Sequence, residues 1–214
     1  MLKKTKKISE YLIGQIDDKL NDVGCPICAL TEKAVNDYID TLFYENVNDP
    51  VERRDFMNGM GYCPKHFQMI ENHLEKHPDL GILGANILYS DLFELLEKAI
   101  EDESVNIGNG CKLCAIEENA QRRYLEIFMD YISNPTRLEK YEKSISMVCL
   151  KHTHMIKNMK NAHFSAFLNI QREKLHRLER AMEEFIRKSD YRNAKEPVSR
   201  IEGEGWRILS KFLE

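Results

Sequence analysis

The 214-residue sequence lacks the features that mark several specialised classes of protein. No apolar run approaches the roughly 18 residues of a transmembrane helix, so we expect no membrane partner. Ten glycines and six prolines are too few for a collagen-like or low-complexity chain. Lys and Arg number 31 against 35 Asp and Glu, and this net charge of −4 argues against nucleic acid as a partner. Basic residues open the chain with no apolar signal core behind them, which predicts a cytoplasmic protein.

Sustained alternation of apolar and polar residues, which is typical of strands, is also missing. Apolar residues instead recur three and four apart, as they do from Leu30 to Phe43. The sequence therefore predicts an all-α fold. We expect an added first helix over about residues 9–22, a short helix capped by Asp49 with Pro50 in its first turn, and one longer helix over about residues 83–99.

Six cysteines are the most informative feature of the composition. In a reducing cytosol they are better explained by metal binding than by disulfides. They fall into four short motifs, which are CPIC at residues 25–28, CPKH at 63–66, CKLC at 111–114 and CLKH at 149–152. Each residue of the second pair of motifs follows its counterpart in the first pair by 86 residues. A repeat of this kind indicates an internal duplication.

The two copies match beyond these motifs. Identical residues at the same spacing include Gly24 and Gly110, Glu32 and Glu118, Tyr38 and Tyr124, Met69 and Met155, Asn72 and Asn158, and His77 and His163. The repeated unit spans residues 24–100 and 110–186. We therefore predict an N-terminal helix (1–24), a first metal-binding helical repeat (25–105), a second one (106–189), and a tail (190–214) whose short helix packs on the body.

A Cys-x2-Cys motif together with a Cys-x2-His motif supplies the Cys₃His ligand set of closed tetrahedral zinc sites. We predict two zinc ions per chain, with the ligands Cys25, Cys28, Cys63, His66, Cys111, Cys114, Cys149 and His152. An iron–sulfur cluster is the alternative cofactor, although such clusters usually take four thiolates. The motifs of each copy are separated by 34 residues, which favours each copy closing its own site. Exchange of motifs between the copies is the alternative.

Function is less well indicated than architecture. The sequence has no phosphate-binding glycine loop and no HExxH motif, and we assign no catalytic residue. We favour a binding or adaptor module for an unknown protein or small ligand, with no indication of its oligomeric state. An iron–sulfur redox protein or sensor is the alternative. A third hypothesis, a hydrolase or transferase, places the following residues around a polar cleft: Asp91, Glu173, Asp190, Arg192 and Glu196.

The other histidines and charged runs have simpler interpretations. We expect His73, His154 and His176 at the surface or at helix ends. His77 and His163 match across the copies and are interpreted as a shared helix-end position rather than as reserve ligands. The runs Gln171 to Lys174 and Arg177 to Glu184 are typical of a charged helix face with i,i+4 pairs.

The duplicated motifs occur together with a late segment that contains Asp190-Tyr191-Arg192, Glu196-Pro197 and Trp206. This combination resembles a family of uncharacterised bacterial and archaeal proteins known only as a domain of unknown function. The resemblance covers most of the chain. It implies an all-α prokaryotic protein and no particular activity.

Overall fold

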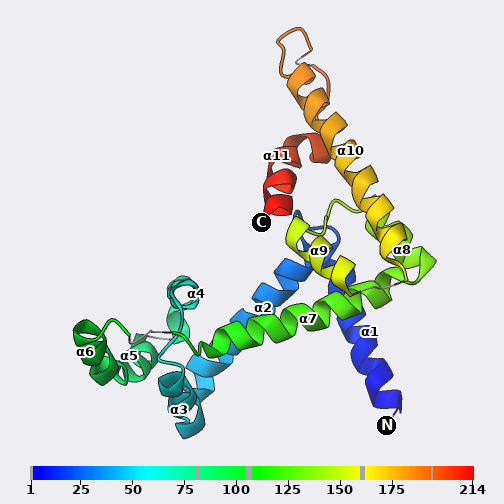
Figure 1. Ribbon diagram of the computed structural model, residues 1–214. Coiled ribbons are helices and arrows are strands. Elements are labelled where there is room, and N and C mark those ends of the chain that lie inside the picture. The colour runs from blue at the N-terminus through cyan, green and yellow to red at the C-terminus, as the bar shows by residue number, and fades with distance from the viewer. Residues whose placement is uncertain (1, 81, 105–107, 160–161, 194) are drawn as a thin grey trace. The chain divides into compact units, whose positions relative to one another are not determined.

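The computed structural model describes residues 2–80, 82–104, 108–159, 162–193 and 195–214 (Figure 1). Helices joined by turns and short loops make up these ranges, which contain no strand. The predicted all-α fold is confirmed. None of the described helices is both long and apolar enough to cross a membrane. The predicted border between the two repeats, at residues 105 and 106, lies outside the described residues.

The chain forms two compact units that do not coincide with the two sequence copies. The first, here called the central unit, comprises Thr31–Ala120, and the second, the terminal unit, combines Met1–Leu30 with Gln121–Glu214. Helix α2 (Pro26–Thr41) begins in the terminal unit and ends in the central unit, whereas α7 (Lys112–Ile132) does the reverse. Each unit is therefore built from parts of both copies.

Besides its parts of α2 and α7, the central unit contains a π-helical turn η1 (Leu42–Asn46), helices α3 (Pro50–Asn58), α4 (Pro64–Lys76), α5 (Ile82–Ser90) and α6 (Phe93–Glu101), and a 3₁₀ turn η2 (Pro78–Leu80). Its core surrounds Phe56, Tyr62 and Ile70, which are almost fully buried. The Phe56 and Tyr62 rings lie 4.9 Å apart, and Phe67 packs edge-on against Tyr62. Aromatic pairs of this kind stabilise the core beyond the burial of their area.

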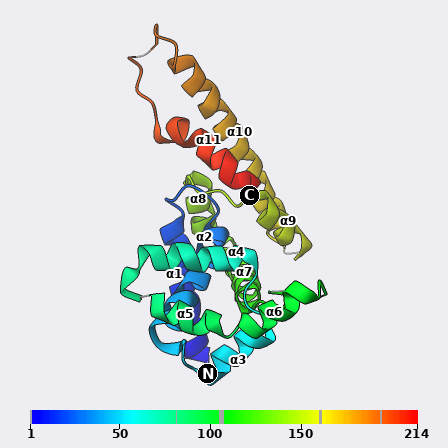
Figure 2. The ribbon, with the colours of Figure 1, turned by 90° about the vertical axis from the view of Figure 1, so that its left-hand side faces the viewer.

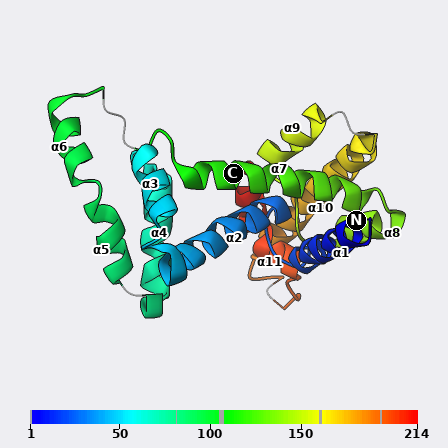
Figure 3. The same ribbon diagram turned by 90° about the horizontal axis from the view of Figure 1, so that it is seen from below.

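The single helix predicted over residues 83–99 is wrong, because the structure has two helices, α5 and α6, with a break at Asp91 and Leu92 (Figure 3). Backbone N–H groups at the break bond three residues back, from Asp91 to Leu88 and from Leu92 to Tyr89. The tighter turn buries Leu92 in the core and places Asp91 against Arg53. Tertiary packing has overridden the local helical pattern.

The terminal unit contains α1 (Leu2–Lys19), α8 (Pro135–Lys143), α9 (Leu150–Asn158), α10 (Phe164–Lys188) and α11 (Arg200–Leu213), with its parts of α2 and α7. The Phe128, Tyr141 and Phe167 rings pack together in its core, with centroids 5.1–6.2 Å apart. Helix α11 folds back along α10 (Figure 2) and buries Ile208 and Phe212.

Corresponding helices of the two copies begin in the same way. Asp49 caps α3 and Asn134 caps α8, and each side chain accepts hydrogen bonds from two backbone N–H groups ahead of it. Each cap is followed by a proline at the first helical position, Pro50 and Pro135. The helix start predicted at Asp49 is present, and the duplication is visible in the caps as well as in the cysteine motifs.

Candidate metal centres

The eight predicted ligands gather into two groups of four, one in each unit. The terminal group consists of Cys25, Cys28, Cys149 and His152, and the central group consists of Cys63, His66, Cys111 and Cys114. Each group has the predicted Cys₃His composition. However, each takes its CxxC motif from one copy and its CxxH motif from the other. The expectation that each copy closes its own site is wrong, and the exchanged arrangement is the one observed.

Backbone contacts between glycines explain the pairing in the central unit. Gly108 donates its N–H to the carbonyl of Met60 at 2.7 Å, and Gly110 donates to Gly59 at 3.2 Å. These bonds hold the segment before Cys111 against the segment before Cys63. The approach leaves no room for side chains, because a Cβ on Gly59 would lie 2.5 Å from the oxygen of Gly110. Gly108 also has a φ of +77°, which glycine adopts at no steric cost.

The terminal unit brings its two motifs together by a similar contact. Met147 donates its backbone N–H to the carbonyl of Gly24 at 3.0 Å, and the Ser146 hydroxyl donates to the same oxygen at 3.1 Å. Gly24 immediately precedes Cys25 and has a φ of +121°. The loop before each CxxC motif is thus joined to the loop before the CxxH motif of the other copy.

Within the terminal group, one ring nitrogen of His152 faces all three thiols. Its Nδ1 atom lies 3.4 Å from Sγ of Cys25, 3.3 Å from Sγ of Cys28 and 3.1 Å from Sγ of Cys149. The Sγ atoms of Cys28 and Cys149 are 3.7 Å apart. Cys25, Cys149 and His152 are buried, and Cys28 is half-buried.

The central group repeats this geometry. Nδ1 of His66 lies 3.2 Å from Sγ of Cys63, 3.5 Å from that of Cys111 and 3.4 Å from that of Cys114. The Sγ atoms of Cys63 and Cys114 are 3.6 Å apart. This group is more accessible than the terminal one, because Cys114 is exposed and Cys63 is half-buried.

These separations fit a single tetrahedral ion. Bonds of about 2.3 Å to sulfur and 2.0–2.1 Å to nitrogen, at tetrahedral angles, place two sulfurs about 3.8 Å apart and a sulfur and a nitrogen about 3.6 Å apart. The observed sulfur–sulfur distances are 3.6–3.7 Å, and the sulfur–nitrogen distances are 3.1–3.5 Å. The eight residues can therefore hold one metal ion per group with little movement.

The thiols already favour a partly ionised state. Hydrogen bonds from Cys25 and Cys28 hold the pKa of the Cys149 thiol well below its usual range. Bonding to that thiolate raises the pKa of Cys28 to about 12, and burial raises the pKa of Cys25. Cys149 is also the N-cap of α9, where the helix dipole favours negative charge. A cation bound here would replace the shared protons and allow all three thiols to ionise.

In the central group, too, the pKa of one thiol is lowered and that of a neighbouring thiol is raised. Burial alone would raise the pKa of Cys63, but hydrogen bonds from the His66 N–H and from Cys114 and Cys111 outweigh it, and the pKa lies below its ordinary value. Burial raises the pKa of Cys114 to about 12. Burial also lowers the pKa of His66, which favours the neutral imidazole that a metal requires.

The second nitrogen of each histidine has a different neighbour in the two groups. Nε2 of His66 is buried without a hydrogen-bond partner, and a carboxylate oxygen of Glu117 lies 3.4 Å from it. Glu117 also pairs with Lys65. The side-chain amide of Gln121 lies beside Nε2 of His152, with 2.7 Å between the two nitrogens. A metal on Nδ1 leaves a proton on Nε2. His66 would donate this N–H to the Glu117 carboxylate, and His152 would donate it to the side-chain oxygen of Gln121 once that amide is turned by about 180°.

A buried polar network holds the backbone of Val148, the residue before Cys149, in place. The Tyr141 hydroxyl accepts from the backbone N–H of Val148, and the Gln171 amide donates to the Val148 carbonyl at 2.7 Å. Lys174, only 3% exposed, donates to the Tyr141 and Ser144 carbonyls at the C-terminal end of α8. The charged helix face expected over residues 171–174 does not include Gln171 and Lys174, because both side chains are buried.

The charged residues of the third hypothesis form local ion pairs within each unit. Asp91 pairs with Arg53 in the central unit; in the terminal unit Asp190 pairs with Arg192, and Glu173 is exposed on α10. Glu196 pairs with Arg187. These local ion pairs account for Asp91, Asp190, Arg192 and Glu196.

His73 lies in the last turn of α4, which agrees with the helix-end expectation, but it is buried rather than at the surface. It is 8% exposed and bonds through Nε2 to the Asp40 carboxylate at 2.7 Å. His77 does lie at a helix end, as the C-cap of α4, and its ring stacks on that of His73. Sequence reasoning also missed Glu117 and Gln121, which lie against the ligand histidines, and Gln171, which bonds to Val148 next to Cys149, because all three contacts arise only in the tertiary structure.

The fold and the two groups define an internally duplicated all-α protein with two Cys₃His sites that could hold a metal ion. The chain belongs to a family of unknown function (DUF6062), whose sequence profile matches residues 7–92 and again residues 90–203. It is 24% identical over 201 residues to an uncharacterised 23.9 kDa protein in the xynA 3′ region of Caldicellulosiruptor sp. (strain Rt8B.4). That match covers 88% of this chain and 94% of the relative. No solved structure matches the chain significantly.

Proposed function

We propose that the protein is a zinc-stabilised helical module with one closed Cys₃His zinc site in each unit, and that it acts in the cytoplasm by binding a partner rather than by catalysing a reaction. The spacing of the donor atoms carries this proposal, because all four in each group fit the coordination sphere of one ion. Four protein ligands leave no position for the water that a catalytic zinc retains. The metal would therefore have a structural role.

Each zinc ion would stabilise the fold by joining distant parts of the chain. In the terminal group it would connect the start of α2 to the start of α9, where Cys28 and Cys149 are 121 residues apart in sequence. Without the metal, the buried thiols of a group can ionise only partly, because neighbouring thiolates repel one another. Metal binding is thus coupled to folding, and we expect chelation to destabilise the protein.

The binding role is supported by apolar side chains that the central unit leaves exposed. Phe93 and Ile100 on α6 are 66% and 86% exposed, and α6 has no buried residue. Exposed apolar clusters often mark interaction sites. A Phe93→Ser/Ile100→Ser double variant should keep its metal and its helicity while losing a specific partner. Retention of that partner would argue against α6 as the binding surface.

An iron–sulfur cluster is less well supported by the same distances. A cluster holds its iron atoms apart, so its protein ligands span more than one coordination sphere. The sulfur atoms here lie 3.6–3.7 Å apart, as the ligands of a single ion do. The Cys₃His set also differs from the four thiolates that most clusters use.

Metal analysis after anaerobic purification tests the proposal. We expect about two zinc ions per chain, no visible absorbance, and a loss of thermal stability after chelation. A brown, iron-containing sample that dithionite bleaches would favour the iron–sulfur alternative. Metal-free protein with undiminished helicity and stability would contradict both.

A further inference from the structure

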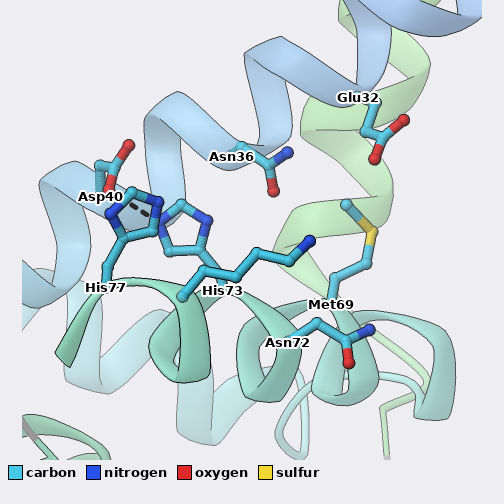
Figure 4. Close-up of a pocket in the computed structure, with 8 residues that line it drawn as sticks. Glu32, Asn36, Asp40, Met69, Asn72, His73 and His77 are labelled. Carbon is cyan, nitrogen blue, oxygen red and sulfur yellow. Dashed lines mark hydrogen bonds and ion pairs between the residues drawn. The ribbon is translucent and has the colours of Figure 1, made fainter.

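The central unit has a second set of side chains of metal-ligating types, separate from the cysteine groups. They line a cavity of about 330 Å³ between α2 and α4 (Figure 4). Helix α2 contributes one face, with residues spaced four apart, and α4 contributes its last two turns. The lining residues are Glu32, Asn36 and Asp40 from α2, and Met69, Asn72, His73, Lys76 and His77 from α4.

Asp40 fixes the orientation of the His73 ring. One carboxylate oxygen of Asp40 lies 2.7 Å from Nε2 of His73, so this nitrogen carries the proton and donates it to the carboxylate. The lone pair of Nδ1 is then available to a ligand. In Figure 4 this second nitrogen points away from Asp40 and toward the space between the two helices. A histidine held by a carboxylate in this way is the usual arrangement of a metal-bound imidazole.

His77 supplies a second imidazole beside the first. It follows His73 by one helical turn, and the two rings stack with their centroids 4.5 Å apart. Two histidines at i and i+4 on one helix face are a common pair of transition-metal ligands. His77 is exposed at the end of α4, so turning its ring toward a shared ion would disrupt only its stacking on His73 among the ring contacts of the described residues.

We propose that His73 and His77 bind a third, exchangeable divalent transition-metal ion, and that Asp40 is a positioning residue for His73. Two imidazoles favour copper, nickel, cobalt or zinc over magnesium and calcium. The carboxylates of Glu32 and Asp40 outnumber the single ammonium of Lys76 in the lining, which favours a cation. Water would complete the coordination sphere, so this site is open, unlike the two Cys₃His groups.

The duplication indicates that such a site occurs once per chain. Glu32 and His77 recur 86 residues later as Glu118 and His163, but the position of His73 is occupied by Met159. The second copy therefore lacks one of the two imidazoles. The predicted stoichiometry is one exchangeable ion in addition to the metal held by the cysteine groups.

Nickel binding measured by calorimetry on zinc-loaded protein tests this proposal. Wild-type protein should bind one Ni²⁺ ion, and His77→Ala should weaken that binding at least tenfold. Because His77 is exposed, this variant should fold normally, and its difference from wild type isolates the pocket whatever the cysteine groups hold. Asp40→Asn should weaken binding about tenfold to a hundredfold without removing a ligand.

The matched control is His176→Ala, which removes an exposed histidine from α10 and should bind Ni²⁺ as wild type does. Two results would overturn the proposal. One is wild-type protein that binds no Ni²⁺ below millimolar concentration. The other is a His77→Ala variant whose nickel affinity equals that of wild type.

Discussion

The Sγ atoms of Cys28 and Cys149 lie 3.7 Å apart, although 121 positions separate these residues in the sequence and each belongs to a different copy of the repeat. Along the sequence, the second and third motifs form the central group, and the first and fourth motifs form the terminal group. A metal in the terminal group would join the beginning of the repeat region to its end. The first and the last motif of the duplicated region thus belong to the same group.

The two groups should release metal at different rates. The central group includes the exposed Cys114, whereas three of the four ligands of the terminal group are buried. A chelator should therefore remove zinc in two phases of about equal amplitude, with the central group emptied first. A colorimetric zinc assay during chelation measures both phases.

Cys114→Ser identifies the faster phase. In this variant the fast phase should disappear while the slow phase keeps its rate and amplitude. Release in one phase from the wild-type protein, or loss of the slow phase in the variant, would show that exposure of Cys114 does not control access to the metal.

The close approach of Gly59 and Gly110 should be required for the central group. Gly59→Ala would place a Cβ 2.5 Å from the Gly110 oxygen and push the two ligand-bearing segments apart. We expect loss of one zinc per chain and destabilisation by about 2 kcal/mol or more, a magnitude typical of overpacking. Metal analysis and thermal unfolding measure the two effects.

Gly14→Ala is the matched control for this substitution. Gly14 lies within α1, and a Cβ there would meet no atom within 4 Å. The variant should keep both metals and gain up to about 1 kcal/mol from the higher helix propensity of alanine. Full metal content in Gly59→Ala would disprove the role of the glycine contact.

Lys174 should make stability depend on pH. Burial, aided by the charge of Arg177 and opposed by Glu142, lowers the pKa of Lys174 to about 7 from its ordinary value of 10.5. Between these values the unfolded chain binds a proton that the folded protein does not, so stability rises with pH. The slope should be about 1 kcal/mol per pH unit within this window, and no further change from Lys174 should occur below it.

Comparison of zinc-loaded wild type with Lys174→Met isolates this effect. Denaturant unfolding between pH 7 and 9.5 should show a shallower rise in the variant, because methionine does not titrate. The ligand thiols contribute equally in both proteins, so the difference between the two slopes reports Lys174. Equal slopes in the two proteins would show that Lys174 remains charged when buried.

The helices and the ligand set could be predicted because they depend on local pattern. The spacing of apolar residues, the Asp49-Pro50 start and the four motifs are all contained within short segments of sequence. The pairing of the motifs could not be predicted in this way. His66 is separated from Cys111 by 44 residues and Cys28 from Cys63 by 34, and loop-closure entropy distinguishes such lengths by only a few tenths of a kcal/mol.

Tertiary contacts decide the remaining features. The backbone approach of Gly59 and Gly110 selects the partner of Cys63, and the burial of Leu92 breaks the predicted long helix. Likewise, His73 is buried because Asp40 on α2 faces it, which no pattern in α4 alone indicates. Each of these features depends on residues that are distant in sequence.

The central claim, that the metal groups join motifs of different copies, is tested most directly by mapping cysteine reactivity in Cys149→Ser. The metal-loaded variant is treated with iodoacetamide, and the modified cysteines are identified by mass spectrometry. The exchanged pairing predicts that Cys25 and Cys28 become reactive while Cys111 and Cys114 react as they do in wild type. The claim is contradicted if Cys111 and Cys114 become reactive while Cys25 and Cys28 stay protected.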